Sequence, residues 1–176
     1  MYHIKHDKRA ESSVELICTA VLELLETKPL GEITISDVQR RSTVSRSTFY
    51  RNFDSLEDVL ALLCDRGFDE IAAGSWAPVY IRVFHYWFNN AAVLEALVRT
   101  GQADILAESL KKLLLRSKEL PGMDEARLDY FAANIGYVMT GILATWLRRG
   151  RRESEEELAG ILADCFAAAG AMLMLG

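Results

Sequence analysis

Apolar residues recur along the chain at the three- and four-residue spacing of an amphipathic helix, and strand-like alternation is hard to find. The first run covers residues 8–27, with Val14 and Ile17 on its apolar face. Pro29 follows and marks its end, because proline cannot continue a helix. Only three prolines interrupt the 176 residues. The pattern predicts an all-α protein.

Short polar residues stand where helices begin. Thr34 and Ser154 are each followed three residues later by an acid, which predicts a capping box. Ser45 and Ser55 are the N-caps that we expect for two further helices. The nine expected helices are 8–27, one that begins at Thr34, 45–53, 55–73, 80–89, 91–99, 102–118, 125–149 and one that follows Ser154.

The stretch from Gly74 to Pro78 is the clearest break in the chain. We expect a three-helix N-terminal domain over residues 1–54 and a six-helix C-terminal domain over 55–176. The helix at about 55–73 would link the two domains.

Charge changes the picture of the N-terminal part. The whole chain has a formal net charge of −5, yet residues 38–53 contain no carboxylate and four arginines. Residues 1–52 carry a net charge of +1 and the remainder carries −6. A window free of acids suits a surface that approaches phosphate, although four arginines also occur on an ordinary solvated helix face.

The helix at 45–53 has two different faces. Phe49 and Phe53 fall together and should point into a core. The opposite face carries donors, which are Arg46, Ser47, Thr48, Tyr50 and Arg51. Two helices joined by a short turn, the second presenting such side chains, predict a helix-turn-helix whose second helix enters a major groove. Lys5, Lys8 and Arg9 would add a flexible basic arm.

At these residues the chain resembles the TetR (tetracycline-repressor-like) family of transcriptional regulators. The resemblance covers residues 8–70, through LLETKP, ITISDV, VSRSTFYRNF and SLEDVLALL in that order. It implies a homodimer formed through the last two helices and a ligand pocket in the C-terminal domain. The leading hypothesis is a ligand-responsive regulator of transcription, a repressor rather than an activator, that binds a near-palindromic DNA operator. The resemblance also implies DNA contacts at Thr34, Ser45, Arg46, Ser47, Thr48, Tyr50 and Arg51, with Thr34 and Tyr50 on phosphate.

Two residues depart from the family's pattern. Thr43 occupies the turn position where the family usually has glycine, which predicts a different or strained turn. Leu56 stands where the family favours a phosphate-binding lysine. These departures leave open a second hypothesis, a TetR-like co-regulator that acts mainly through a protein partner, as in the branch related to dihydroxyacetone kinase control.

Aromatic residues crowd into residues 76–88, which hold six of the chain's sixteen. They are either core filler or the lining of a largely apolar effector pocket with a few polar groups. We favour the pocket as a set, with Trp76, Tyr80, Phe84, His85, Phe88, Asn134 and Tyr137 as its candidate residues. The helix at 125–149 has two apolar stripes, which suits a helix that meets both its own core and a partner subunit.

The apolar segment 158–175 is almost long enough to span a membrane. Asp164 near its middle argues against this, and we expect a soluble-protein helix covered by a partner subunit. No signal-peptide pattern occurs near residue 1, so we expect a cytoplasmic protein.

Metal, cofactor and enzyme chemistry find little support in the sequence. The three cysteines, Cys18, Cys64 and Cys165, are far apart among apolar residues and are expected to be buried and reduced. His3 and His6 make a poor metal site by themselves. With no nucleophile–base pair or phosphate loop, we expect neither an enzyme nor a cofactor.

Overall fold

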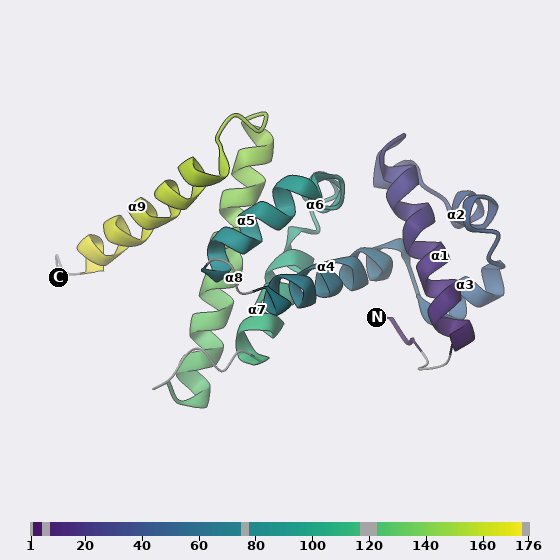
Figure 1. Cartoon of the computed structure of the whole chain (residues 1–176), viewed down its shortest axis with the longest axis horizontal. Coiled ribbons are helices and arrows are strands. Elements are labelled where there is room, and N and C mark those ends of the chain that lie inside the picture. Colours follow the sequence, from purple (N-terminus) through teal and green to yellow (C-terminus); the bar gives the residue numbers. More distant parts are fainter. Residues whose placement is uncertain (1, 5–7, 75–77, 117–122, 174–176) are drawn as a thin grey trace. The chain divides into compact units, whose positions relative to one another are not determined.

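The computed structural model describes residues 2–4, 8–74, 78–116 and 123–173, and these residues form helices and no strands (Figure 1). The all-α prediction is therefore confirmed. In chain order the helices are α1 (Lys8–Leu25), the 3₁₀ turn η1 (Leu30–Glu32), α2 (Ile35–Ser42), α3 (Arg46–Asn52), α4 (Leu56–Ala73), α5 (Val79–Asn89), α6 (Ala91–Arg99), α7 (Ala103–Arg116), α8 (Glu125–Arg148) and α9 (Glu155–Leu173).

The chain forms two compact units. The first combines Met1–Arg66 with Ala92–Leu106, and the second combines Gly67–Ala91 with Ala107–Gly176. Helix α4 begins in the first unit and ends in the second. The division into domains at residue 54, with α4 as the link, stays a prediction.

The first unit is built on a small core between α1, α2 and α3. Phe53 is fully buried and Phe49 is 2% exposed, as their shared face of the helix predicts. Val14 and Ile17 of α1 and Val38 of α2 are buried as well. Each such side chain contributes about 1.5–3 kcal/mol when it leaves water, so this core fixes how α3 is held.

The helix caps predicted at Thr34, Ser45 and Ser154 are present, and the N-cap at Ser55 stays a prediction. Thr34 accepts a hydrogen bond from the Asp37 amide, and Asp37 accepts one from the Thr34 amide, which is the full capping box. Ser154 and Glu157 form the same reciprocal pair at the start of α9. Ser45 accepts a hydrogen bond from the Thr48 amide at the start of α3.

The second unit is built on α5, α7, α8 and α9. Phe84 and Trp87 of α5 are fully buried, and Leu143 of α8 is 1% exposed. By length and composition α8 is apolar enough to cross a membrane, a test that the core helix of a soluble protein also passes. Its buried residues pack inside this unit, which fits a core helix.

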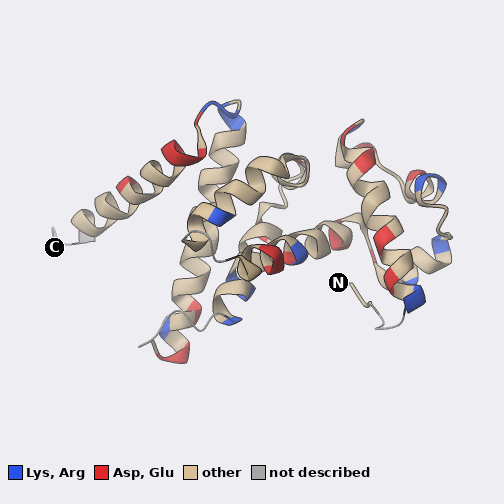
Figure 2. Ribbon diagram, in the orientation of Figure 1, with Lys and Arg blue, Asp and Glu red and all other residues tan. Residues whose placement is uncertain are grey.

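The N-terminal part of helix α9 packs against the rest of the second unit, and the C-terminal part is exposed. Leu158 and Leu162 are buried, whereas the positions described between Ala163 and Met172 are exposed. Figure 2 shows acidic residues at the start of α9 and little charge beyond.

One sequence prediction about burial is wrong. Cys18 and Cys64 are buried as expected, but Cys165 is exposed, because its position on α9 has no neighbour within the described chain that covers it.

Candidate nucleic-acid interface and apolar cavity

The turn between α2 and α3 has a strained backbone at Thr43. Its φ is 60° and its ψ is 4°, the left-handed conformation that glycine adopts without cost. A β-branched residue is seldom found there. The Ser42 hydroxyl accepts a hydrogen bond from the Val44 amide at 3.1 Å and helps to hold the turn. The strained turn expected from the sequence is thus observed.

Helix α3 presents a polar face over a buried aromatic one. Ser47, Tyr50 and Arg51 are exposed, and Tyr50 retains 55% of its surface. The Tyr50 ring packs edge-on against Phe49, with 5.5 Å between ring centroids. Thr48 is half-buried. Phe49 thus contacts the Tyr50 ring while more than half of the Tyr50 surface stays accessible.

The hydroxyl groups at the start of α3 bond to one another. The Ser45 hydroxyl lies 2.9 Å from those of Ser47 and Thr48 while it also caps the helix. Arg46 donates to the Ser36 hydroxyl of α2, so its guanidinium lies across the two helices. Ser45 is therefore engaged in the helix end, and Arg46 is held near it.

The basic residues of α2 are partly paired. Arg40 lies 3.2 Å from a carboxylate oxygen of Asp37, and Arg41 pairs with Glu23 of α1. The Lys28 ammonium lies 2.7 Å from the other Asp37 oxygen. Hydrogen bonds from Lys28 and then Thr34 hold the pKa of Asp37 well below its usual range. Asp37 therefore stays ionised and anchors the start of α2.

Residues near the N-terminus are tied to the end of α3 and to α4. The His3 amide donates to the Asn52 carbonyl at 2.8 Å, and the Tyr2 hydroxyl donates to Asp65 at 2.6 Å. Of the three residues expected in a flexible arm, Lys8 and Arg9 form the first turn of α1 instead, and Lys5 lies outside the described residues. Leu56, in place of the family's lysine, is the half-buried first residue of α4.

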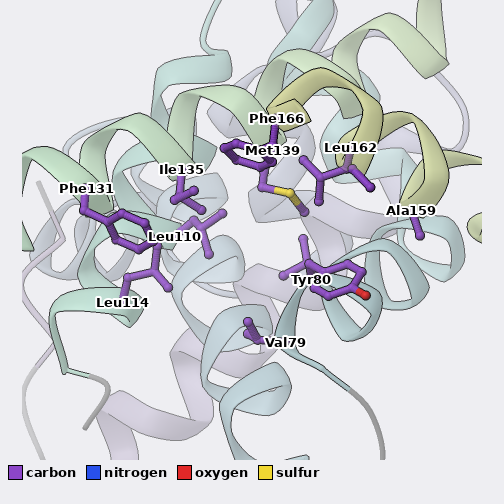
Figure 3. Close-up of a pocket in the computed structure, with 12 residues that line it drawn as sticks. Val79, Tyr80, Leu110, Leu114, Phe131, Ile135, Met139, Ala159, Leu162 and Phe166 are labelled. Atoms are coloured by element: carbon purple, nitrogen blue, oxygen red, sulfur yellow. The ribbon is translucent and has the colours of Figure 1, made fainter. Parts of the chain in front are cut away.

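The second unit contains a cavity of about 370 Å³ (Figure 3). Helices α5, α7, α8 and α9 supply its described lining, which consists of Val79, Tyr80, Val83, Leu110, Leu114, Phe131, Ile135, Met139, Ala159, Leu162, Ala163 and Phe166. No charged side chain belongs to this set. Its volume falls within the usual range for small-molecule sites.

Of the seven residues expected to line a pocket, Tyr80 does so. Phe84 is buried in the core, and Phe88 stacks on Trp146 with 4.1 Å between ring centroids. His85 is exposed and lies 3.2 Å from the Glu155 carboxylate. Asn134 and Tyr137 are exposed on another face of α8, and Trp76 lies outside the described residues.

The sequence contained a signal for the α8 wall of the cavity. Phe131, Ile135 and Met139 recur every four residues on one stripe, which marks a helix face but does not distinguish packed core from the edge of a cavity. Among the described residues no group of three or more histidines, cysteines or acids is placed to hold a metal ion.

Comparison with known proteins places these features in context. Residues 74–167, more than half of the chain, match a TetR-type family profile described as "Transcriptional regulator C-terminal region". A segment of 53 residues is 45% identical to the HTH-type transcriptional regulator EthR of Mycobacterium tuberculosis. That segment is 30% of this chain and spans only 24% of EthR.

Solved structures share the fold. Lin0861 from Listeria innocua superposes with a TM-score of 0.76 at 14% identity, over 95% of this chain and 96% of the other. The dihydroxyacetone kinase operon activator DhaS superposes with a TM-score of 0.60 at 17% identity, over 89% and 95%. These likenesses show that the chain shares the fold of both proteins over most of its length.

Proposed function

Because the chain belongs to the TetR family of transcriptional regulators, we propose that it is a cytoplasmic DNA-binding repressor that acts as a homodimer and responds to a small-molecule effector. The observation that carries the proposal is the exposed polar face of α3, with Tyr50 and Arg51 outward above buried Phe49 and Phe53. The family consists of regulators rather than enzymes, so the chemistry to explain is recognition.

On this proposal α3 lies in the major groove of DNA. Arg51 and Arg46 are the candidates for guanine, whose O6 and N7 accept a bidentate guanidinium. Tyr50 and Thr34 would contact phosphates, while Ser47 and Thr48 reach bases or backbone. Ser45 contributes by fixing the start of α3, since its hydroxyl already bonds to Ser47 and Thr48. The absence of acids from residues 38–53 supports this docking.

The dimer would form through α8 and α9. Tyr130 and Tyr137, which are 79% and 54% exposed, share one stripe of α8, and Met172 of α9 is 76% exposed. An apolar helix left uncovered in one chain is expected to find cover against another. A twofold dimer would then place two copies of α3 about 34–36 Å apart, on successive major grooves of a near-palindromic operator.

The effector would occupy the cavity of the second unit and contact Tyr80. Helix α4 continues the chain from α3 toward that unit, so a change at α4 is the simplest route from effector to reading helix. To switch the protein almost completely, the effector must favour the non-binding state by roughly 5.5 kcal/mol.

The test of DNA binding is fluorescence anisotropy with labelled DNA from upstream of the protein's own gene, repeated across salt concentrations. Arg51→Ala should weaken binding by about 1–3 kcal/mol if Arg51 reads a base. Tyr50→Phe should weaken binding to all sequences alike. Arg99→Ala, which removes an exposed arginine of α6, is the control with the same change in charge and should bind like wild type.

Weak binding whose affinity changes neither with salt concentration nor in the two α3 variants would contradict the proposal. It would favour the co-regulator that works through a protein partner, for which Leu56, in place of a phosphate-binding lysine, is the specific observation. DhaS is described as an operon activator, so a reporter assay should also establish the sign of regulation.

The dimer is tested separately by sedimentation velocity. Ile161→Lys places a charge on the exposed side of α9, where Ile161 is 39% exposed, and should shift the protein toward monomer. Thr19→Lys, at an exposed position on α1, should leave the mass of the assembly in solution at that of the wild type. A monomeric wild type would contradict the proposed dimer.

A further inference from the structure

The chemistry of the cavity wall is unusually uniform. Its twelve described lining residues are aliphatic, aromatic or methionine, and the hydroxyl of Tyr80 is the one oxygen or nitrogen that their side chains contribute. Figure 3 shows these side chains converging from four helices, with the Tyr80 oxygen at one side. A ligand inside therefore meets hydrocarbon almost everywhere.

Such a wall discriminates against charge. An ion that leaves water needs a charged or hydrogen-bonding partner, and without one its transfer is strongly unfavourable. Apolar surface of the ligand, by contrast, gains free energy in proportion to the area that is buried. The lining therefore favours the apolar surface of a ligand, and it offers no charged partner to an ion.

We propose that the effector is an uncharged, largely apolar small molecule that carries at most one hydrogen-bonding group, which Tyr80 contacts. The name effector rests on the proposed regulatory function. The binding site itself rests only on the cavity. It names the class of ligand that the cavity selects.

A matched pair of fluorescent probes tests the selection. N-phenyl-1-naphthylamine and 8-anilino-1-naphthalenesulfonate share one aromatic framework, and only the second carries a sulfonate. We expect the neutral probe to bind at least about tenfold more tightly, as judged by the rise in its emission on titration. Equal affinity, tighter binding of the sulfonate, or no binding of the neutral probe would overturn the proposal.

A second pair of variants tests the location, because apolar probes also adhere to exposed helices. Ala159→Phe adds a ring at a residue that lines the cavity and should weaken the neutral probe at least about tenfold by filling the space. Ala168→Phe makes the same change on the exposed part of α9, half a turn away from Ala159, and should leave affinity unchanged. If the variant outside the lining weakened the probe more than Ala159→Phe did, the probe would bind on the surface of α9 and the proposal would be overturned.

Two further measurements keep the result interpretable. Ala163→Phe, at another lining position, replaces Ala159→Phe if circular dichroism shows that the first variant does not fold. Tyr80→Phe should reduce the preference for 1-naphthol over naphthalene, and an unchanged preference would remove Tyr80 from the proposal.

DNA binding is measured in the same preparations without any probe. If DNA binding fails while the neutral probe still binds in the cavity, the regulatory function is wrong and the ligand class stands. If DNA binds and only charged probes bind, the ligand class is wrong and the regulatory function stands.

Discussion

Gly136 of α8 lies directly against the backbone of Ala107 of α7. A Cβ atom added to Gly136 would come within 2.6 Å of the Ala107 carbonyl oxygen, closer than real Cβ atoms approach. Glycine at this position is therefore required by packing rather than by backbone conformation. The close approach of these two helices also sets the position of the nearby α7 and α8 residues that line the cavity, among them Leu110 and Ile135.

Replacing Gly136 by alanine should consequently destabilise the protein. Because the obstructing atom belongs to the backbone, the helices must move apart, and the cost should be about 1–3 kcal/mol. Gly141→Ala on the same helix meets nothing within 4 Å and should stabilise the chain by about 0.5–1 kcal/mol through its helix propensity. Urea unfolding at low protein concentration measures both, and the same sign for the two variants would contradict the packing argument.

Thr43→Gly should stabilise the protein. At a φ of 60° the threonine Cβ crowds its own backbone, at a cost of about 1–2 kcal/mol that glycine avoids. Glycine loses more entropy on folding, so a net gain of about 1 kcal/mol is expected. Thr19→Gly, inside α1, is the matched control and should destabilise by about 0.3 kcal/mol, the difference between the helix propensities of threonine and glycine. A loss of stability in Thr43→Gly would mean that the turn is not strained in solution.

The ion pair at Asp37 should make stability depend on pH. Lys28 and Thr34 lower the pKa of the Asp37 carboxyl in the folded protein, so the folded state binds its proton less readily than the unfolded chain. The resulting stabilisation is fully present above the unfolded pKa, about 3.9, and is lost as the pH falls below that value toward the folded one. The urea midpoint of the wild type should thus be higher than that of Asp37→Asn near neutral pH. The difference between the two midpoints should become smaller at acid pH.

Asp69→Asn serves as the comparison for that titration. Asp69 pairs with Arg116 at 3.0 Å on an exposed surface, where ion pairs contribute little, so its replacement should scarcely change the urea midpoint. A gap between wild type and Asp37→Asn that stays constant from neutral to acid pH would show that the Asp37 carboxylate is not the source of the effect.

The three cysteines should react at two different rates. Cys165 is exposed and should react rapidly with a thiol reagent. Burial raises the pKa of the Cys18 thiol to about 11, against the opposing effect of Arg66, and Cys64 is fully buried, so both should react after unfolding. Cys165→Ser should abolish the rapid phase. If α9 forms the dimer, that phase should also slow as protein concentration rises.

Local spacing in the sequence was enough to predict the reading helix. Phe49 and Phe53 lie one turn apart, so their burial and the exposure of Tyr50 and Arg51 follow from the geometry of a single helix. The capping box at Thr34 is equally local, because both partners stand within one turn. The strain at Thr43 was predicted from the resemblance, because the family usually has glycine at this turn position.

The cavity depended instead on how separate helices pack. Tyr80 and Phe84 lie one turn apart on α5 and look alike in the sequence, yet the first lines the cavity and the second fills the core. The difference arises from neighbours on α7, α8 and α9, which are far along the chain. Cys165 was misjudged for the same reason, because an apolar segment indicates that a helix needs cover and not that its own chain provides it. The sequence determined the faces of each helix, whereas tertiary packing decided which of those faces meet a neighbour and which enclose space.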